Sequence, residues 1–462
     1  MKKSNLKTED SLKEAQSGRK AQIIMSALLR FKYVSKVFLT TLICVISLQY
    51  LTVYAEALPN HKELPSESFR AMLDENPEVE LLMRESIGIA ARINPDRETN
   101  PVQSLDEIYD FIDYSVTCMP WNIMPEDRYD SFATKCDQSI LYIYWLMDQP
   151  LTALENRGLF YPSVEYLEPV YTWLTEYNNT WRDYLDTTDS WKPEYYELLL
   201  QDPTWNLNKG WYEDPKQWHT FNEFFSRRLS GPDARPVDFP EDDTVVTAPA
   251  DSLPQGVWRI STDGRFEADP IKRENGVIIK DSCFITVEQL LGAEGADYAQ
   301  SFHDGYLTHT YLNYDDYHRY HSPVSGTVKA VYVIPYANAV GGVVYWDPNS
   351  QLYVLESKSL SWQSCETRGV VLIETEYGMV ALIPVGMGQV SSVNFVEAIQ
   401  PGKQIQKGDE VGYFLFGGSD CVMLFEGKSG FSLTAQKGGE GSYSDGYAHV
   451  FCGQEYGRFT PQ

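Results

Sequence analysis

The sequence predicts an α+β protein, with a helical N-terminal domain followed by a mainly β, hairpin-rich domain. Apolar residues in the stretch 58–218 recur at three- and four-residue steps, which is typical of amphipathic helices. From about residue 244 the apolar runs are short and separated by glycines, as in strands joined by turns. Gly231-Pro232 and Arg235-Pro236 break the chain between these two regions. We therefore expect three parts, which comprise residues 1–57, 58–218 and 219–462.

Composition narrows the class of protein. A chain of 462 residues, 43% of them hydrophobic and 13% aromatic, is expected to fold into two or three domains with ample core. The formal net charge of −27 argues against nucleic acid as a partner, because such an acidic chain repels phosphates. The seven cysteines include no CxxC pair and no Cys/His cluster, so neither a zinc site nor a disulfide framework is expected.

The first 57 residues have the pattern of a targeting or anchoring segment. Lys and Arg outnumber Asp and Glu nine to three in residues 1–36, and residues 37–55 form an uncharged, largely apolar run of nineteen. That length is close to what a helix needs to cross a bilayer, and the basic flank should stay cytoplasmic. Ala55-Glu56-Ala57 resembles a cleavage site. We expect an exported or membrane-anchored protein, with the later domains outside the cytoplasm; a buried core helix is the alternative.

Local signals predict individual helices. Ser104-Leu105-Asp106-Glu107 has the capping-box pattern and opens an amphipathic run. Apolar residues between 164 and 185 fall on one face of a helix, where an aromatic stripe is more often core than ligand site. The segment from Thr220 to Leu229 predicts a further short, capped helix.

The β region contains one unusual junction. Runs at 328–334 and 370–373 predict strands, with 374–378 as a hairpin loop after the second. Tight turns between 401 and 412 precede two strand-like runs that meet at Gly417-Gly418-Ser419. A bulge or turn would by itself explain these glycines. A serine that follows an unhindered glycine carbonyl can also attack its own peptide bond when a base is near.

Candidate bases are few, because the chain has seven histidines. His318 and His321 stand three residues apart, a spacing that could place both on one side of a helical turn before a strand at Gly326. Histidine is the side chain most readily poised as a base near neutral pH, although each ring could instead be structural. Asp251 follows the apolar run 244–247, where a lone aspartate is usually a turn residue.

These pieces occur in a familiar order. The order is Phe221–Leu229 (FNEFFSRRL), Pro249-Ala250-Asp251, Asp316–Pro323 (DYHRYHSP) and Gly417-Gly418-Ser419. It resembles the phosphatidylserine decarboxylase family, whose members cleave themselves and use a pyruvoyl group; four ordered motifs are far more specific than any one. Residues 60–218 resemble the extra N-terminal domain of a branch that includes fungal tryptophan decarboxylases. Gly-Gly-Ser replaces the Leu-Gly-Ser common in the lipid enzymes and agrees with that branch, and Ser252 stands where those enzymes usually have glycine.

The resemblance implies a role for each matched residue. Asp251 would orient His321, and His321 would take the hydroxyl proton of Ser419. Ser419 would then attack the Gly418 carbonyl, giving two chains that stay associated, with residue 419 converted into a covalent pyruvoyl cofactor. That cofactor would react with a substrate amine and accept the electrons released with carbon dioxide. His318 would serve in the decarboxylation phase, and no metal is expected.

The sequence is compatible with four functions. We expect a carboxy-lyase that converts phosphatidylserine to phosphatidylethanolamine, favoured by the hydrophobic N-terminus. Decarboxylation of a free aromatic amino acid such as tryptophan is the alternative, favoured by the N-terminal resemblance and by 31 Tyr and 11 Trp. A non-catalytic exported binding protein would stay as one intact chain. A metal-dependent hydrolase would use His318, His321 and Asp251, but no third ligand stands at metal-site spacing.

Overall fold

The computed structural model describes most of the chain after the N-terminal segment. The described residues are 64–124, 128–129, 131–266, 271–272, 278–279, 285–335, 341–356, 362–387, 393–438 and 446–460. The basic N-terminus, the apolar run 37–55 and the cleavage-like ending at 55–57 lie outside them. Among the described residues, no helix combines the length and apolarity needed to cross a membrane.

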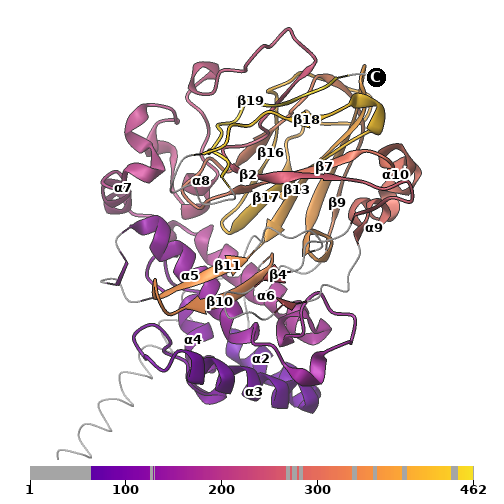
Figure 1. Ribbon diagram of the computed structural model, residues 1–462. Coiled ribbons are helices and arrows are strands. Elements are labelled where there is room, and N and C mark those ends of the chain that lie inside the picture. The colour runs from indigo at the N-terminus through magenta and orange to yellow at the C-terminus, as the bar shows by residue number, and fades with distance from the viewer. Residues whose placement is uncertain are drawn as a thin grey trace, which may run out of the picture. The chain divides into compact units, whose positions relative to one another are not determined.

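Helices dominate the described chain up to residue 199 (Figure 1). They are α2 (Pro65–Glu75), α3 (Pro77–Ile93), α4 (Leu105–Ser115), α5 (Phe132–Met147), α6 (Glu168–Leu185) and α7 (Pro193–Leu199). Four of them, α2, α3, α6 and α7, have proline in the first turn, where its missing N–H costs no helical hydrogen bond. The predicted apolar stripe is largely confirmed in α6, which buries Leu174, Tyr177, Trp181 and Leu185.

The two predicted helix caps have different outcomes. At α4 the helix starts where expected, but the Ser104 side chain makes no capping hydrogen bond, so the capping box is wrong there. Glu107 instead accepts a hydrogen bond from the backbone N–H of Gln103 at 2.7 Å. At α8 (Phe221–Phe225) both halves of the box form between Thr220 and Glu223, so that prediction is confirmed.

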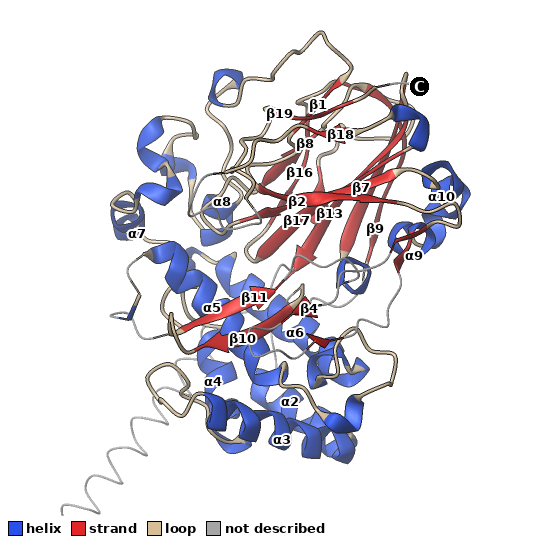
Figure 2. Ribbon diagram, viewed as in Figure 1, coloured by secondary structure: helices blue, strands red, loops and turns tan. Residues whose placement is uncertain are grey.

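Strands dominate from residue 245 onwards, as Figure 2 shows, which confirms the α+β class. The largest sheet among the described residues is antiparallel, in the order β15 (Gln404–Ile405), β9 (Gly326–Ile334), β12 (Arg368–Thr375), β13 (Gly378–Met387), β17 (Gly418–Phe425), β7 (Tyr306–Leu312) and β2 (Leu253–Arg259). The predicted hairpin around 374–378 is confirmed as the turn between β12 and β13.

Smaller sheets and two short helices complete the described elements. One sheet contains β14 (Val393–Phe395), β16 (Glu410–Phe414) and β8 (Arg319–His321), and another contains β1 (Val245–Thr247), β19 (Glu455–Arg458) and β18 (Ser432–Leu433). The two-stranded pairs are β10 (Val343–Asp347) with β11 (Leu352–Glu356), β3 (Arg265–Phe266) with β6 (Ile285–Thr286), and β4 (Ile271–Lys272) with β5 (Ile278–Ile279). The helices are α9 (Val287–Leu291) and α10 (Ala296–Ala299).

The large sheet has a hydrophobic core on each face. Because successive side chains of a strand point to opposite faces, β17 contributes to both cores. Cys421, Met423 and Phe425 join one cluster, whereas Val422 and Leu424 join the other. The strand is buried along its whole length, so its central place in the sheet holds its backbone rigidly between β13 and β7.

The helical region and the strands contact each other directly, and residues 60–462 cluster as one compact unit. The β10–β11 hairpin packs on α5, where the side-chain amide of Gln138 exchanges two hydrogen bonds with the backbone of Tyr353, at 2.7 and 2.8 Å. Trp181 of α6 meets Phe416, the ring that precedes the Gly-Gly-Ser junction, edge to face at 5.3 Å. The helices therefore support the neighbourhood of Ser419.

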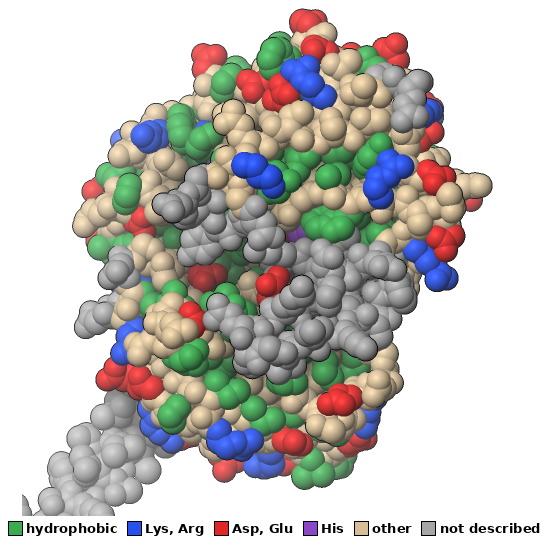
Figure 3. Space-filling view, viewed as in Figure 1, with side chains coloured by type: hydrophobic (Ala, Val, Ile, Leu, Met, Phe, Trp, Pro, Cys, Tyr) green, Lys and Arg blue, Asp and Glu red, His purple; other side chains and the backbone are tan. Residues whose placement is uncertain are grey.

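The described surface shows how charge is distributed. On the face seen in Figure 3, Lys and Arg side chains are scattered among Asp and Glu side chains. Scattered cations hold a phosphate backbone less well than one concentrated basic patch does. Positive and negative side chains are therefore interleaved on this part of the described surface.

Candidate functional site

Strand pairing fixes Ser419 in the middle of the large sheet. Ser419 is the second residue of β17, lies opposite Gly386 of β13 and Leu312 of β7, and is fully buried. Gly417 has a φ of 143°, a backbone conformation that residues with a Cβ rarely adopt. At Gly418 an added Cβ would lie 3.1 Å from the carbonyl oxygen of Met387. Gly417 thus permits the backbone conformation, and Gly418 the close packing against β13, that precede the serine.

His318 is the imidazole next to the serine. Its Nδ1 lies 3.3 Å from Ser419 Oγ, and its Nε2 lies 2.9 Å from the backbone oxygen of Asn313. A carbonyl oxygen can only accept, so Nε2 carries the hydrogen and Nδ1 is left as the acceptor. Burial, reinforced by the positive charge of Arg227, lowers the pKa of His318 to about 3. The ring is therefore neutral and oriented to accept the serine proton.

Residues 221–227, which comprise α8 and the two residues after it and are called the α8 segment below, hold His318 and Ser419 in place. The Phe225 ring stacks on the His318 ring with centroids 3.9 Å apart, and Arg227 Nη2 donates to the backbone oxygens of Asp315 and Asp316, each at 2.9 Å. On the serine side, Asn222 Oδ1 accepts from the backbone N–H of Phe416 at 3.1 Å. In the sequence, Phe221–Leu229 contributes only to the family resemblance, because none of its residues indicates a chemical role by itself.

His321 lies elsewhere, which corrects the expectation of a shared helical turn. Residues 319–321 form strand β8, and His318 lies immediately before it. In extended chain, residues three apart point to opposite sides. His321 Nδ1 donates to the backbone oxygen of Gly408 at 2.8 Å, and its Nε2 lies 3.1 Å from the hydroxyl of Tyr317. Both ring nitrogens are thus engaged away from Ser419.

Asp251 also has partners other than those expected. Its carboxylate forms a buried ion pair with the guanidinium of Arg235, with Oδ1 2.8 Å from Nε, and accepts from the backbone N–H of Cys452 at 2.8 Å. The hydrogen bond to His321 that the resemblance implied is not formed. An arginine binds a carboxylate through two charge-assisted hydrogen bonds, which a neutral imidazole cannot match. In the sequence, Arg235 stands out only as part of a chain break.

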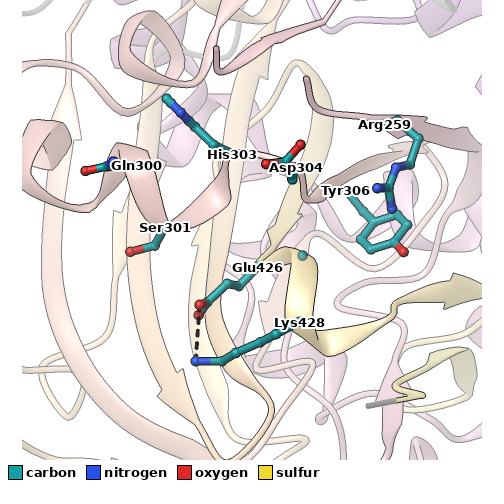
Figure 4. Close-up of a pocket in the computed structure, with 9 residues that line it drawn as sticks. Arg259, Gln300, Ser301, His303, Asp304, Tyr306, Glu426 and Lys428 are labelled. Atoms are coloured by element: carbon teal, nitrogen blue, oxygen red, sulfur yellow. Dashed lines mark ion pairs between the residues drawn. The ribbon is translucent and has the colours of Figure 1, made fainter. Parts of the chain in front are cut away.

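The pocket in Figure 4 is separate from this site. It has a volume of about 380 Å³ and is lined by polar side chains that include Arg259, His303 and Glu426. Glu426 follows the last residue of β17, so the pocket and Ser419 lie at opposite ends of that strand, roughly 20 Å apart at the usual rise per residue. Glu426 is already paired with Lys428 at 3.1 Å, as the dashed line shows.

Across the part of the chain that the structure describes, no three His, Cys, Asp or Glu side chains converge as ligands of a metal ion would. The groups gathered around Ser419 are the His318 imidazole and the residues that orient it.

Comparison with known proteins places these residues in a family. The model of the phosphatidylserine decarboxylase family matches residues 221–458. Phosphatidylserine decarboxylase proenzyme 2 of Oryza sativa subsp. japonica is 34% identical over 236 residues, 51% of this chain and 33% of its own length. Proenzyme 3 of Schizosaccharomyces pombe is 36% identical over 212 residues, 45% and 19% of the two lengths. The proenzyme of Vibrio campbellii is 29% identical over 264 residues, 53% and 83% of the two lengths.

The extent of these matches decides what they show. The chain spans a third or less of the length of the rice and fission-yeast relatives, so these two matches concern only part of each longer protein. The family model, in contrast, covers more than half of this chain. Because its span also contains Asp251, His318, His321, Ser419 and the α8 segment, the chain belongs to the phosphatidylserine decarboxylase family.

Proposed function

We propose that this protein is a self-processing decarboxylase that converts phosphatidylserine to phosphatidylethanolamine. Family membership and the proenzyme relatives support this proposal. The observation that carries it is the 3.3 Å approach of Ser419 Oγ to the acceptor nitrogen of His318, in a buried strand that begins with glycine.

Self-cleavage would begin at that contact. His318 Nδ1 takes the hydroxyl proton, and Ser419 Oγ attacks the carbonyl carbon of Gly418. The acyl group moves from nitrogen to oxygen, so residues 418 and 419 become joined by an ester. Elimination breaks the ester and leaves a carboxylate on Gly418 and dehydroalanine at 419. Water then replaces the nitrogen, ammonia is released, and residue 419 becomes a pyruvoyl group.

The residues present fit such a group. Ser419 is fully buried, so the cleaved end would be shielded from competing reactions with water. A pyruvoyl group supplies a ketone for the substrate's amine and an electron-withdrawing carbonyl when carbon dioxide leaves. The α8 segment would keep His318 beside residue 419 after cleavage, because its contacts lie on the N-terminal side of the cut. Cross-strand bonds from β13 and β7 would hold the new chain end in the sheet.

The roles of the two histidines are proposed on different grounds. Geometry favours His318 as the base for self-cleavage, whereas the resemblance assigned that role to His321 and assigned turnover to His318. In our proposal Asp251 keeps the loop around Cys452 in place through its ion pair with Arg235. His321 ties β8 to the Gly408 turn.

The site of action is also proposed. The uncharged run 37–55 behind a basic flank supports export or anchoring of the domains that follow, where a phospholipid headgroup would be met. Separating the full chain into membrane and soluble fractions, before and after deletion of residues 1–57, measures this. Equal recovery in the soluble fraction for both forms would contradict it.

The decisive experiment is the intact mass of the purified protein. We expect two chains, the smaller comprising residues 419–462 with a ketone in place of its amino group, and an uncut, inactive Ser419→Ala variant. Carbon dioxide release from phosphatidylserine vesicles and from free tryptophan then compares the substrates. An unbroken wild-type chain would refute self-processing, and release from tryptophan alone would refute the lipid substrate.

A further inference from the structure

A second acid–base pair lies one residue beyond Ser419, on the other face of the strand. Ser419 shares its face of β17 with Cys421 and Met423, whereas Asp420 points to the opposite face with Val422 and Leu424. Asp420 also supplies the peptide nitrogen that would remain attached to residue 419 after cleavage. Its side chain is therefore as close to that residue as the chain permits, yet has no part in the contact with His318.

The carboxylate of Asp420 is paired with His309 of the neighbouring strand β7. Asp420 Oδ2 lies 2.7 Å from His309 Nδ1, and both side chains are 1% exposed. Trp258 stacks on the imidazole with centroids 5.3 Å apart, and the ring of Trp362 meets it edge to face at 6.4 Å. The aromatic rings fix the imidazole plane, and the carboxylate fixes which nitrogen carries the hydrogen.

Each member of the pair has a polar atom left over. Among the described residues, neither His309 Nε2 nor Asp420 Oδ1 has a hydrogen-bond partner. Neighbouring buried groups on β7 are paired: Thr308 contacts Tyr456 at 2.8 Å, and Thr310 donates to Ser252 at 2.7 Å. A buried polar atom without a partner destabilises the folded state, and an apolar pair would avoid that cost. Two such atoms beside the cleavage point suggest a ligand rather than a packing role.

We propose that Asp420 and His309 form a proton-accepting site for the ammonium group of the substrate. This inference rests on the proposed decarboxylase function and adds a catalytic residue to it. Asp420 Oδ2 holds the hydrogen on His309 Nδ1, so Nε2 presents a lone pair, as in other carboxylate–imidazole pairs. Nε2, on the side of the ring away from Asp420, takes one proton from the ammonium group.

The proton balance of this step is simple. The ammonium group loses one proton to Nε2 and becomes an amine, whose lone pair is then free to attack a ketone. The imidazolium that results stays paired with the Asp420 carboxylate. The same proton can return to the carbon that loses carbon dioxide, and one further proton from solvent completes the ammonium product. His318 is less suited to this step, because its Nε2 is occupied by Asn313 and its Nδ1 faces the opposite side of β17.

The test uses the self-processed protein and three substitutions. His309→Gln and Asp420→Asn remove the two members of the pair. His303→Gln is the matched control, since His303 pairs with Glu288 at 3.0 Å beside the pocket in Figure 4. We expect all three to yield two chains, with kcat/KM lowered about 100-fold in the first two and unchanged in the control.

A second measurement does not depend on turnover. With histidine labelled by nitrogen-15, adding ethanolamine to the processed wild-type protein should shift the His309 Nε2 resonance and leave the His303 resonances unchanged. In Asp420→Asn the His309 resonance should not shift. If the wild type fails to decarboxylate phosphatidylserine, this shift still reports whether the pair binds an amine. An unmoved His309 resonance, or wild-type turnover in a folded His309→Gln protein, would overturn the proposal.

Discussion

The ring of Phe225 stacks on the imidazole of His318, with 3.9 Å between their centroids and 25° between their planes. Phe225 ends α8, and His318 comes immediately before β8, so this aromatic contact joins the two segments together with the hydrogen bonds of Arg227 to Asp315 and Asp316. Aromatic contacts of this kind hold a ring in one orientation in addition to burying its area. The position of the imidazole relative to Ser419 therefore depends on a helix about ninety residues earlier in the chain.

Removing that ring should slow self-cleavage. We expect Phe225→Ala to lower stability by about 3–5 kcal/mol, as is usual for a buried phenylalanine, and to slow chain separation at least tenfold, because the imidazole can then rotate. Phe431→Ala is the control, since Phe431 stacks on Phe425 at 3.9 Å at the far end of β17. Equal cleavage rates in the two variants would show that the Phe225 contact is only structural.

The two histidines can be separated by single substitutions. We expect His318→Asn to remain uncut, or to be cut about 100-fold or more slowly, because Ser419 loses its proton acceptor. His321→Asn should still be cut, with lower stability from the lost contacts to Gly408 and Tyr317. Denaturing gels over a time course measure both. The reverse pattern would support the assignment that the family resemblance implied.

The buried ion pair between Arg235 and Asp251 should be costly to break. Asp251→Asn leaves the guanidinium buried without its counter-charge, so we expect a loss of about 3–5 kcal/mol in urea unfolding. The double variant Arg235→Met with Asp251→Leu should lose less, because no charge is left unpaired. If Asp251→Asn instead unfolds like the wild type but cannot cleave itself, the carboxylate serves the chemistry directly.

Asp137 on α5 gives a prediction for pH. Burial raises the pKa of its carboxyl to about 7, although Gln138 donates to it at 3.1 Å. The folded state therefore holds the proton more tightly than the unfolded chain, whose pKa is about 3.9, so this contribution to stability is present below pH 4 and is lost as pH rises through 7. We expect Asp137→Asn to match the wild type at pH 4 and to exceed it by up to about 4 kcal/mol at pH 8.

The control for this prediction is Asp106→Asn, which removes an exposed carboxylate from α4. Its effect on stability should be small at both pH values. Thermal unfolding at pH 4 and pH 8 measures all three proteins. A stability difference for Asp137→Asn that does not change with pH would contradict the assigned cause.

Local signals in the sequence were sufficient for several elements. The Thr220–Glu223 capping box, the β12–β13 hairpin and the α+β class follow from propensities and turn residues within a few positions of one another. The capping box predicted at α4 did not form, because another hydrogen bond competed with it. At α4 the Glu107 side chain reached Gln103 instead of completing the box with Ser104.

Contacts between distant segments could not be predicted in the same way. The three-residue spacing of His318 and His321 fits a helical turn as well as it fits a strand. The pairing of β8 with β16 makes the chain extended here, so the two rings point to opposite sides. Arg235 takes the Asp251 carboxylate because the fold brings a guanidinium to it, and nothing in the residues around Arg235 indicates this.

By itself the sequence determined the identity and order of the reactive residues, from Asp251 through the two histidines to Ser419, since motifs are strings of side chains. The tertiary structure decided which of them meet. Ser419 and His318 are 101 positions apart, and their contact is set by strand register, by the α8 segment and by burial, all of which depend on packing across the whole sheet.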